Sequence, residues 1–130
     1  MLLGHGDNLC TDDIEYQSFR EKIRSESWKN EFLKKSLSER ISIANEFRKE
    51  SELNKKNKSM EIMDVNNEEV NQTLIRFNYP DFFIHGHTHR PNRHSIWLDG
   101  HEIQRIVLGD WYEQGSYLSF NANGIETHQI

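Results

Sequence analysis

Apolar residues recur at a spacing of four through residues 14–49, which is the spacing of one face of a helix. The pairs with this spacing are Phe19 with Ile23, Trp28 with Phe32, Leu33 with Leu37, and Ile43 with Phe47. We therefore expect two or three amphipathic helices, and we interpret their aromatic residues first as the packed core of a helical subdomain.

Polar side chains stand where two of these helices should begin. Asp13 and the two residues before it can accept hydrogen bonds at the start of the first helix. Ser36 and Glu39 have the Ser-x-x-Glu spacing of a capping box, which predicts the start of another helix at this point.

Residues 51–59 are polar and basic, and we expect a break in the helical pattern there. A solvated linker is the first interpretation of this composition, and a phosphate-binding loop is the alternative. Asn66 with Glu69 can then cap a further helix, in which Val70, Leu74 and Phe77 share one face. The Pro80 that follows should end this helix.

The rest of the pattern indicates strands. Residues 1–3 are read as the stub of a buried strand, and residues 81–84 as a short apolar strand. Residues 95–98 and 103–108 flank an Asp-Gly turn, and residues 117–120 and 125–128 flank the Asn123-Gly124 turn, so two hairpins are expected. The fold class is α/β, in the mixed sense of α+β. A parallel strand with no preceding element suggests that the chain begins inside a domain.

Composition narrows the class of protein. The 130 residues suit one domain, and 35% hydrophobic content with seven Phe, four Tyr and three Trp is not that of a disordered chain. The formal charge of -5 argues against a nucleic-acid partner. The single Cys10 cannot form an intramolecular disulfide and suits a reducing compartment. We find no apolar run long enough to span a membrane and no secretory signal, so a cytoplasmic location is expected.

Histidines supply the candidate chemistry. His87 and His89 follow the apolar strand 81–84, and His5 stands between two glycines after the first strand. Imidazole is a common metal ligand, and loops at strand ends are where α/β sites gather. Three imidazoles could make a zinc-type site with one open position, whereas two divalent ions would also need carboxylates. An incidental His-x-His pair remains the alternative.

These motifs resemble a known family. Gly-His-Gly at residues 4–6 and Gly-His-Thr-His at residues 86–89 resemble the last two motifs of calcineurin-like metallophosphoesterases. Four longer stretches resemble the UDP-2,3-diacylglucosamine hydrolases of lipid A biosynthesis within that superfamily. They run from His5 to Asp13, from Lys58 to Asn66, from Ile84 to Pro91, and from Val107 to Trp111.

The resemblance implies a fold and a division of the chain. The fold would be the C-terminal portion of an α/β/β/α sandwich with a helical insertion cap. Residues 1–13 would form a strand and metal loop of the phosphoesterase core, residues 14–66 the helical insertion over the lipid, and residues 67–130 the rest of the core with a β-meander.

It also implies an activity and a cofactor. In that family a dinuclear manganese centre cleaves the pyrophosphate of UDP-2,3-diacylglucosamine to UMP and 2,3-diacylglucosamine 1-phosphate (lipid X). Two metal ions clamp phosphate oxygens and activate a water molecule. By motif, His5 and His87 would bind one manganese ion and His89 the other. His87 would also be catalytic, against the substrate phosphates.

Substrate contacts are implied by the same resemblance at Asp13, Ser51 and Lys58. Ser51 and Lys58 keep the family's separation of seven residues. Lys55 stands where the family has Asn, so either Lys55 supplies a charge to phosphate or Asn54 takes over the contact. The apolar faces of the helices expected over residues 14–49 would enclose the two acyl chains of the substrate. They would also contact the cytoplasmic face of the inner membrane.

The family's earlier motifs, Asp-x-His, Gly-Asp and Gly-Asn-x-Asp, would precede His5, and they do not occur there. We therefore expect the chain alone to bind manganese poorly and to hydrolyse nothing. Met1 could be an internal residue of a longer reading frame, a restart codon in a decaying gene, or the start of one half of a split enzyme. A metallophosphoesterase with another substrate, a non-catalytic remnant and a subunit that needs a partner chain are the competing hypotheses.

Overall fold

The computed structural model describes residues 1–59, 61–112, 115–122 and 124–130, and leaves the side chains of residues 55–57 undescribed. The chain divides into two compact units. Residues 1–9 and 65–130 form one, here called the sheet unit, and residues 10–64 form the other, here called the helical unit. These boundaries fall a few residues from those of the predicted segments, whose roles stay predictions.

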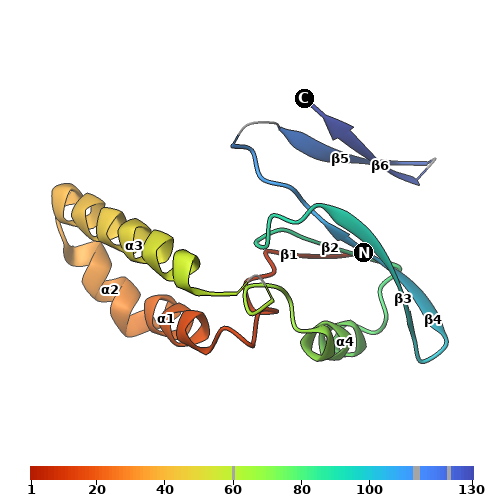
Figure 1. Cartoon of the computed structure of the whole chain (residues 1–130), viewed down its shortest axis with the longest axis horizontal. Coiled ribbons are helices and arrows are strands. Elements are labelled where there is room, and N and C mark those ends of the chain that lie inside the picture. Colours follow the sequence, from red (N-terminus) through yellow and green to blue (C-terminus); the bar gives the residue numbers. More distant parts are fainter. Residues whose placement is uncertain (60, 113–114, 123) are drawn as a thin grey trace. The chain divides into compact units, whose positions relative to one another are not determined.

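A four-stranded sheet organises the sheet unit, with strand order β1-β2-β4-β3 (Figure 1). The strands are β1 (Leu2–Gly4), β2 (Phe82–His85), β3 (Asn92–Leu98) and β4 (His101–Val107). β1, β2 and β4 run parallel, and β3 pairs antiparallel with β4 through the predicted Asp-Gly turn. The predicted mixed α/β class is confirmed, while the assignment to the C-terminal portion of an α/β/β/α sandwich and the helical cap stay predictions.

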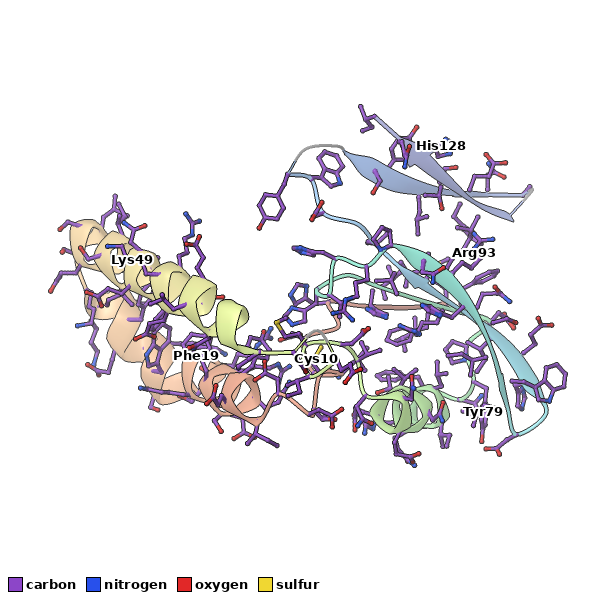
Figure 2. All side chains as sticks on the ribbon, viewed as in Figure 1. Cys10, Phe19, Lys49, Tyr79, Arg93 and His128 are labelled. Carbon is purple, nitrogen blue, oxygen red and sulfur yellow. The ribbon has the colours of Figure 1, made fainter. Side chains whose placement is uncertain are left out.

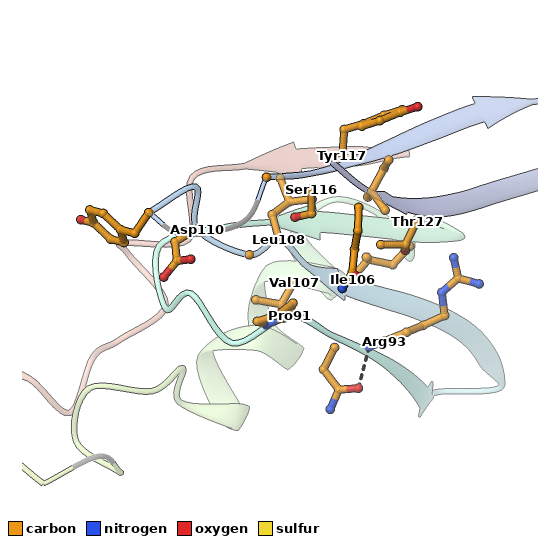
Figure 3. A pocket seen from close by; sticks show the side chains of 15 residues that line it. Pro91, Arg93, Ile106, Val107, Leu108, Asp110, Ser116, Tyr117 and Thr127 are labelled. Carbon is orange, nitrogen blue, oxygen red and sulfur yellow. Dashed lines mark hydrogen bonds between the residues drawn. The ribbon is translucent and has the colours of Figure 1, made fainter.

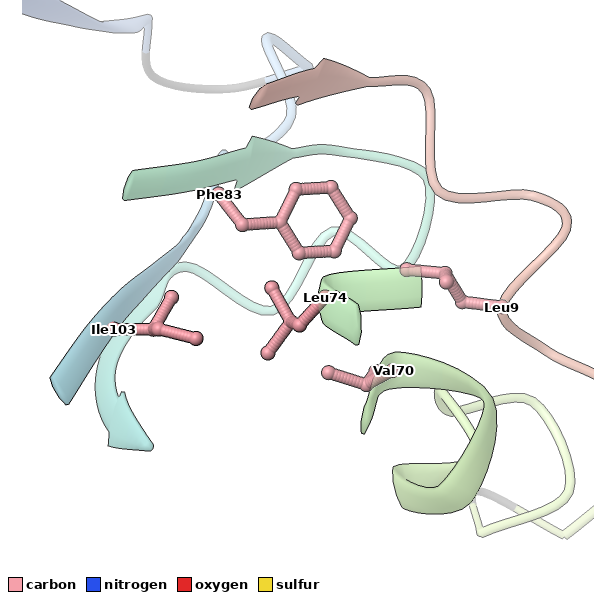
Figure 4. Close-up of a cluster of buried hydrophobic side chains, with 5 residues drawn as sticks. All are labelled: Leu9, Val70, Leu74, Phe83 and Ile103. Carbon is pink, nitrogen blue, oxygen red and sulfur yellow. The ribbon is translucent and has the colours of Figure 1, made fainter. Parts of the chain in front are cut away.

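Helix α4 (Asn67–Arg76) packs on this sheet. Asn66 caps it by accepting from the backbone N–H of Glu69, as predicted. Val70 and Leu74 are buried in a cluster with Leu9, Phe83 and Ile103 (Figure 4). This cluster is the core of the unit, and it draws side chains from the loop after β1, from α4 and from two strands.

Two details of the predicted core are wrong. Phe77 is 54% exposed because α4 ends one residue earlier, and the chain turns away through left-handed backbone at Asn78 and Tyr79. β1 was expected to be buried, yet Leu3 is 69% exposed. As an outer strand, β1 turns only alternate side chains toward α4, and Leu2 is the one that packs against the core.

The last two strands form a separate antiparallel pair, β5 (Ser116–Asn121) with β6 (Gly124–Gln129). The predicted second hairpin is confirmed, although Asn123 of its turn lies outside the described residues. Phe120 of this pair contacts Phe82 edge-on at 6.2 Å between ring centroids. Arg93 of β3 donates to the carbonyl of Ile125, which ties the hairpin to the main sheet.

The helical unit contains α1 (Ile14–Arg24), α2 (Glu26–Lys34) and α3 (Leu37–Asn57). Asp13, Ser25 and Ser36 cap the three helices, and Ser36 with Glu39 forms the predicted capping box. Aromatic rings join the helices, as the labelled Phe19 in Figure 2 illustrates. Phe19 of α1 contacts Phe47 of α3 at 5.0 Å between centroids, and the centroid of Trp28 of α2 lies 6.1 Å from that of Phe47.

The predicted break at residues 51–59 is wrong for most of its length. α3 continues through Asn57, and the chain leaves helical geometry at Lys58. The segment holds no Gly or Pro, and its Glu, Leu and Lys residues have good helix propensity, so its polarity marks a solvated helix rather than a loop. Among the described residues, no helix is both long enough and apolar enough to cross a membrane.

Candidate functional site

The two Gly-His loops meet at the carboxyl ends of adjacent parallel strands. Gly4 pairs with His85 at the ends of β1 and β2, so the residues that follow each strand emerge side by side. The backbone N–H of Gly86 donates to the carbonyl of His5 at 3.0 Å. The rings of His5 and His87 then meet edge to face, with 5.1 Å between centroids. The structure thus brings together two of the three predicted metal ligands.

The loop backbones hold unusual conformations. Gly6 has φ +100°, while His87 and His89 have φ +67° and +53°. Left-handed backbone costs a non-glycine residue about 1 kcal/mol, so surrounding contacts must hold these histidines in place. A Cβ at Gly6 would lie 2.8 Å from Nδ1 of His85 and 3.1 Å from the carbonyl oxygen of Gly86. Glycine is therefore required for this close approach of the two loops.

His89 lies beside a different set of groups. Its Nδ1 is 3.8 Å from Oδ2 of Asp110, and its ring centroid is 6.0 Å from that of Tyr112. No group of three or more His, Cys, Asp or Glu side chains suited to a metal ion occurs in the described part of the chain. The residues present therefore fit part of a metal site, namely two neighbouring imidazoles, and do not fit a pair of divalent ions without further carboxylates.

Asp13 and Lys58, two predicted substrate contacts, form an ion pair inside the helical unit. Nζ of Lys58 donates to Oδ1 of Asp13 at 2.5 Å and lies 3.1 Å from Oε2 of Glu15. The side chains of Lys58 and Asp13 are 16% and 11% exposed. Burial alone would lower the pKa of Lys58, but its hydrogen bonds and charge interactions with Asp13 and Glu15 together raise that pKa above its ordinary value.

Ser51 and Lys55, the other predicted substrate contacts, lie in the last turns of α3. Ser51 is exposed, and its separation of seven residues from Lys58 is close to two helical turns. The side chain of Lys55 lies outside the described residues, so the choice between Lys55 and Asn54 stays open.

A cavity of about 690 Å³ lies between β3, β4 and the β5–β6 pair (Figure 3). Its lining is mostly apolar side chains and backbone, with Asp110 and Tyr112 at the loop after β4. None of the predicted site residues lines it. The cavity adjoins the candidate site at Asp110 and Tyr112, which line it and also lie beside His89.

Three residues near the histidines were missed by sequence reasoning. His85 is fully buried at the end of β2, Arg105 approaches it from β4, and Asp110 faces His89. Asp110 could have been suspected, because β2 and β4 are parallel neighbours and a carboxylate after one strand lies near a histidine after the other. His85 and Arg105 carry no such signal, since only the observed register brings them together.

Comparison with known proteins confirms the resemblance over the whole chain. The chain is 42% identical to a UDP-2,3-diacylglucosamine hydrolase of Bordetella pertussis, covering 100% of this chain and 52% of the relative. It is 44% identical to a protein of that name from Aromatoleum aromaticum (95% and 50%) and 43% to one from Xanthomonas axonopodis pv. citri (99% and 55%). No family model matches. The chain spans about half the length of these relatives and matches their carboxy-terminal part.

Proposed function

We propose that this chain is the carboxy-terminal part of a UDP-2,3-diacylglucosamine hydrolase, which cleaves the substrate's pyrophosphate to UMP and 2,3-diacylglucosamine 1-phosphate in lipid A biosynthesis. The similarity of the entire chain to hydrolases of this name carries the proposal. The meeting of the two Gly-His loops supports it, because the motifs that define the resemblance converge in space.

The proposed cofactor is a pair of manganese ions, with His5 and His87 holding one ion and His89 the other. Bound manganese would supply Lewis acidity and an activated water. The chain's imidazoles are neutral donors, and hard divalent ions favour carboxylate oxygens, so further ligands are required from outside this chain. The inactivity of the isolated chain is part of the proposal.

The role proposed for His87 is to orient the substrate phosphates. Its edge-to-face contact with His5 and its left-handed backbone restrict the ring to one side of the strand ends. A ring held in this way can donate to a phosphate oxygen without first losing rotational freedom, which favours a productive geometry.

The helical unit is proposed to bind the diphosphate and the lipid. An ammonium has three N–H donors, and Asp13 with Glu15 accounts for two contacts of Lys58, so a phosphate oxygen can be the third. Ser51 and Lys55 would add contacts along the end of α3. Large apolar side chains on these helices are exposed, which supports contact with acyl chains and with the cytoplasmic face of the inner membrane. They include Ile14, Leu33, Leu37, Ile41 and Leu53.

The second candidate is a metallophosphoesterase subunit that needs a partner chain, or a non-catalytic remnant of one. The described residues hold two adjacent imidazoles without a third metal-binding group, and this favours a chain that is incomplete by itself. A phosphoesterase with another substrate is less well supported, because the resemblance extends through the insertion motifs at residues 10–13 and 58–66.

The test compares the chain alone with an enzyme completed by fusing it to the amino-terminal portion of a relative. Manganese binding is titrated, and release of UMP from UDP-2,3-diacylglucosamine is followed. We expect weak binding and no turnover for the chain alone, and turnover for the completed enzyme. His87→Ala or His89→Ala should lower turnover by at least about 100-fold, whereas the exposed His101→Ala should leave it unchanged.

Two results would contradict the proposal. Two tightly held manganese ions with turnover in the isolated chain would refute its inactivity. A completed enzyme that binds manganese but leaves UDP-2,3-diacylglucosamine intact would refute the substrate.

A further inference from the structure

We infer that His85 is a positioning residue that holds His87 against His5, with Arg105 selecting the tautomer that lets it do so. This inference rests on the proposed function only for the consequence in catalysis. Its structural part concerns hydrogen bonds within the sheet unit, and it is testable in the chain by itself.

The side chain of His85 lies between two hydrogen-bonding groups. It is 0% exposed, its Nε2 is 3.0 Å from Nη1 of Arg105, and its Nδ1 is 3.0 Å from the carbonyl oxygen of Gly86. Arg105 is also buried, at 7% exposure. Both polar edges of the ring are therefore engaged inside the protein.

The chemistry of the two partners fixes the tautomer. A guanidinium can only donate, so Nε2 of His85 must be the acceptor in its contact with Arg105. The proton of the neutral ring then resides on Nδ1, which donates to the carbonyl of Gly86. Arg105 thus determines that the ring presents a donor, and not a lone pair, to the loop.

That carbonyl belongs to the peptide that joins Gly86 to His87. The φ angle of His87 is the rotation of its Cα against this same peptide plane, and it has the left-handed value of +67°. The backbone N–H of Thr88 donates to the carbonyl of Gly86 at 2.9 Å across His87, and the hydrogen bond from His85 adds to it in fixing the plane and opposing relaxation of His87 to ordinary backbone. The N–H on the other side of Gly86 donates to the carbonyl of His5, so both peptides flanking Gly86 are held.

The ring of His85 also sets the spacing of the two loops. A side chain at Gly6 would come within 2.8 Å of Nδ1 of His85, so the loop after β1 rests directly on this ring. The side chains of His5 and His87 extend from these two loops, and their ring centroids are 5.1 Å apart. One buried imidazole therefore orients the peptide before His87 and supports the loop that carries His5.

The parallel register explains why Arg105 reaches His85. Arg105 pairs with Phe83, and His85 lies two residues further along β2 on the same face of the sheet. The long arginine side chain extends along the strand direction toward the carboxyl end, where the histidine loops begin. Arg105 is thus connected to the loops through His85, although it lies within the strand.

The experiment uses nuclear Overhauser contacts between the ring protons of His5 and His87 in the 130-residue chain. His85→Phe keeps the ring shape and removes both hydrogen bonds, and we expect it to lose this contact. His85→Asn keeps a donor near the Nδ1 position and should retain it. His101→Phe, a matched change at an exposed histidine that stacks on Tyr79, should also retain it.

A second variant separates positioning from folding. His85→Phe alone leaves Arg105 without one acceptor, so the double change His85→Phe with Arg105→Met removes the buried charge as well. We expect this double variant to keep the thermal midpoint of the native chain and still lose the His5–His87 contact. Retention of the contact in a folded double variant would overturn the inference.

In the completed hydrolase, the double variant should lower kcat by roughly 10- to 100-fold with KM little changed, as for groups that orient a ligand. Rescue of kcat by His85→Asn supports positioning, and an unchanged kcat in His85→Phe overturns it. If the completed enzyme lacks the proposed activity while the ring contact responds as expected, the proposed function fails and the positioning role stands.

Discussion

The sheet unit and the helical unit are stabilised in different ways. The sheet unit encloses a cluster of apolar side chains, with Leu9, Leu74 and Ile103 each 0% exposed. In the described part of the helical unit, the buried residues are Cys10 and Asp13, and α1 and α2 bury none. Its helices depend instead on end caps, partly exposed ring contacts and the ion pair of Lys58.

This contrast suits the proposed division of labour. Histidines that must keep a fixed geometry emerge from a sheet with a packed core, whereas the residues proposed to meet a lipid lie on helices with exposed apolar faces. Weakly packed segments open at low free-energy cost, so the helical unit is the part of the chain able to adapt to acyl chains.

The largest effect should come from the core of the sheet unit. Leu74→Ala removes a fully buried side chain and should lower the free energy of unfolding of that unit by about 3 kcal/mol. Hydrogen exchange read separately on peptides of the two units measures it. Leu33→Ala, at a side chain 62% exposed in the helical unit, is the control and should change stability by about 0.5 kcal/mol or less. Equal effects at the two sites would remove the contrast between the units.

Loss of the ion pair between Lys58 and Asp13 should have the second-largest effect on stability, and it should destabilise only the helical unit. Lys58→Met leaves the buried carboxylate of Asp13 without its ammonium partner and should cost about 2 kcal/mol. Lys29→Met is the control, because its pair with Glu26 is exposed and worth little.

The pH dependence of this pair has a definite sign. Because folding raises the pKa of Lys58, its contribution is present below the ordinary value of 10.5 and is lost as pH rises through the folded-state pKa. Chemical denaturation above neutral pH should therefore show the gap between the native chain and Lys58→Met persisting until strongly alkaline solution, where it narrows. A gap that closes near neutral pH would contradict the assignment of this stability to the lysine.

The smallest effect should come from a helix cap. Ser36→Ala removes the capping box at the start of α3 and should cost about 1 kcal/mol, visible as faster hydrogen exchange in the first turn of that helix. Ser42→Ala, at an exposed interior position of α3, should be neutral or slightly stabilising because alanine has the higher helix propensity. Faster exchange in both variants would show that the cap has no special role.

Local signals in the sequence predicted most of the secondary structure. The spacing of four, the capping box at Ser36 and the Asn66 cap each act within a few residues, and the structure has helices at these places. The end of α3 was missed because a run of lysines and asparagines looks like a loop by polarity although its backbone propensities permit a helix.

The candidate site was predictable only in part. The convergence of His5 and His87 follows from parallel strands with Gly-His at their ends, and the sequence contains both signals. The approach of Arg105 to His85 depends on which residues of β2 and β4 are paired. A shift of that register by two residues would keep the same side chains on the buried face, so the hydrophobic pattern alone does not select the observed pairing. The roles proposed toward metal and substrate stay predictions.

The outer position of β1 bears on how the chain should behave in concentrated solution. In the part of the chain that the structure describes, this strand has β2 on one side, and its other side presents peptide groups next to Leu3, which is 69% exposed. Such an edge is a template for another strand. Self-association of the isolated chain is therefore expected to begin at residues 2–4, and a charged residue in place of Leu3 should suppress it while sparing the buried cluster.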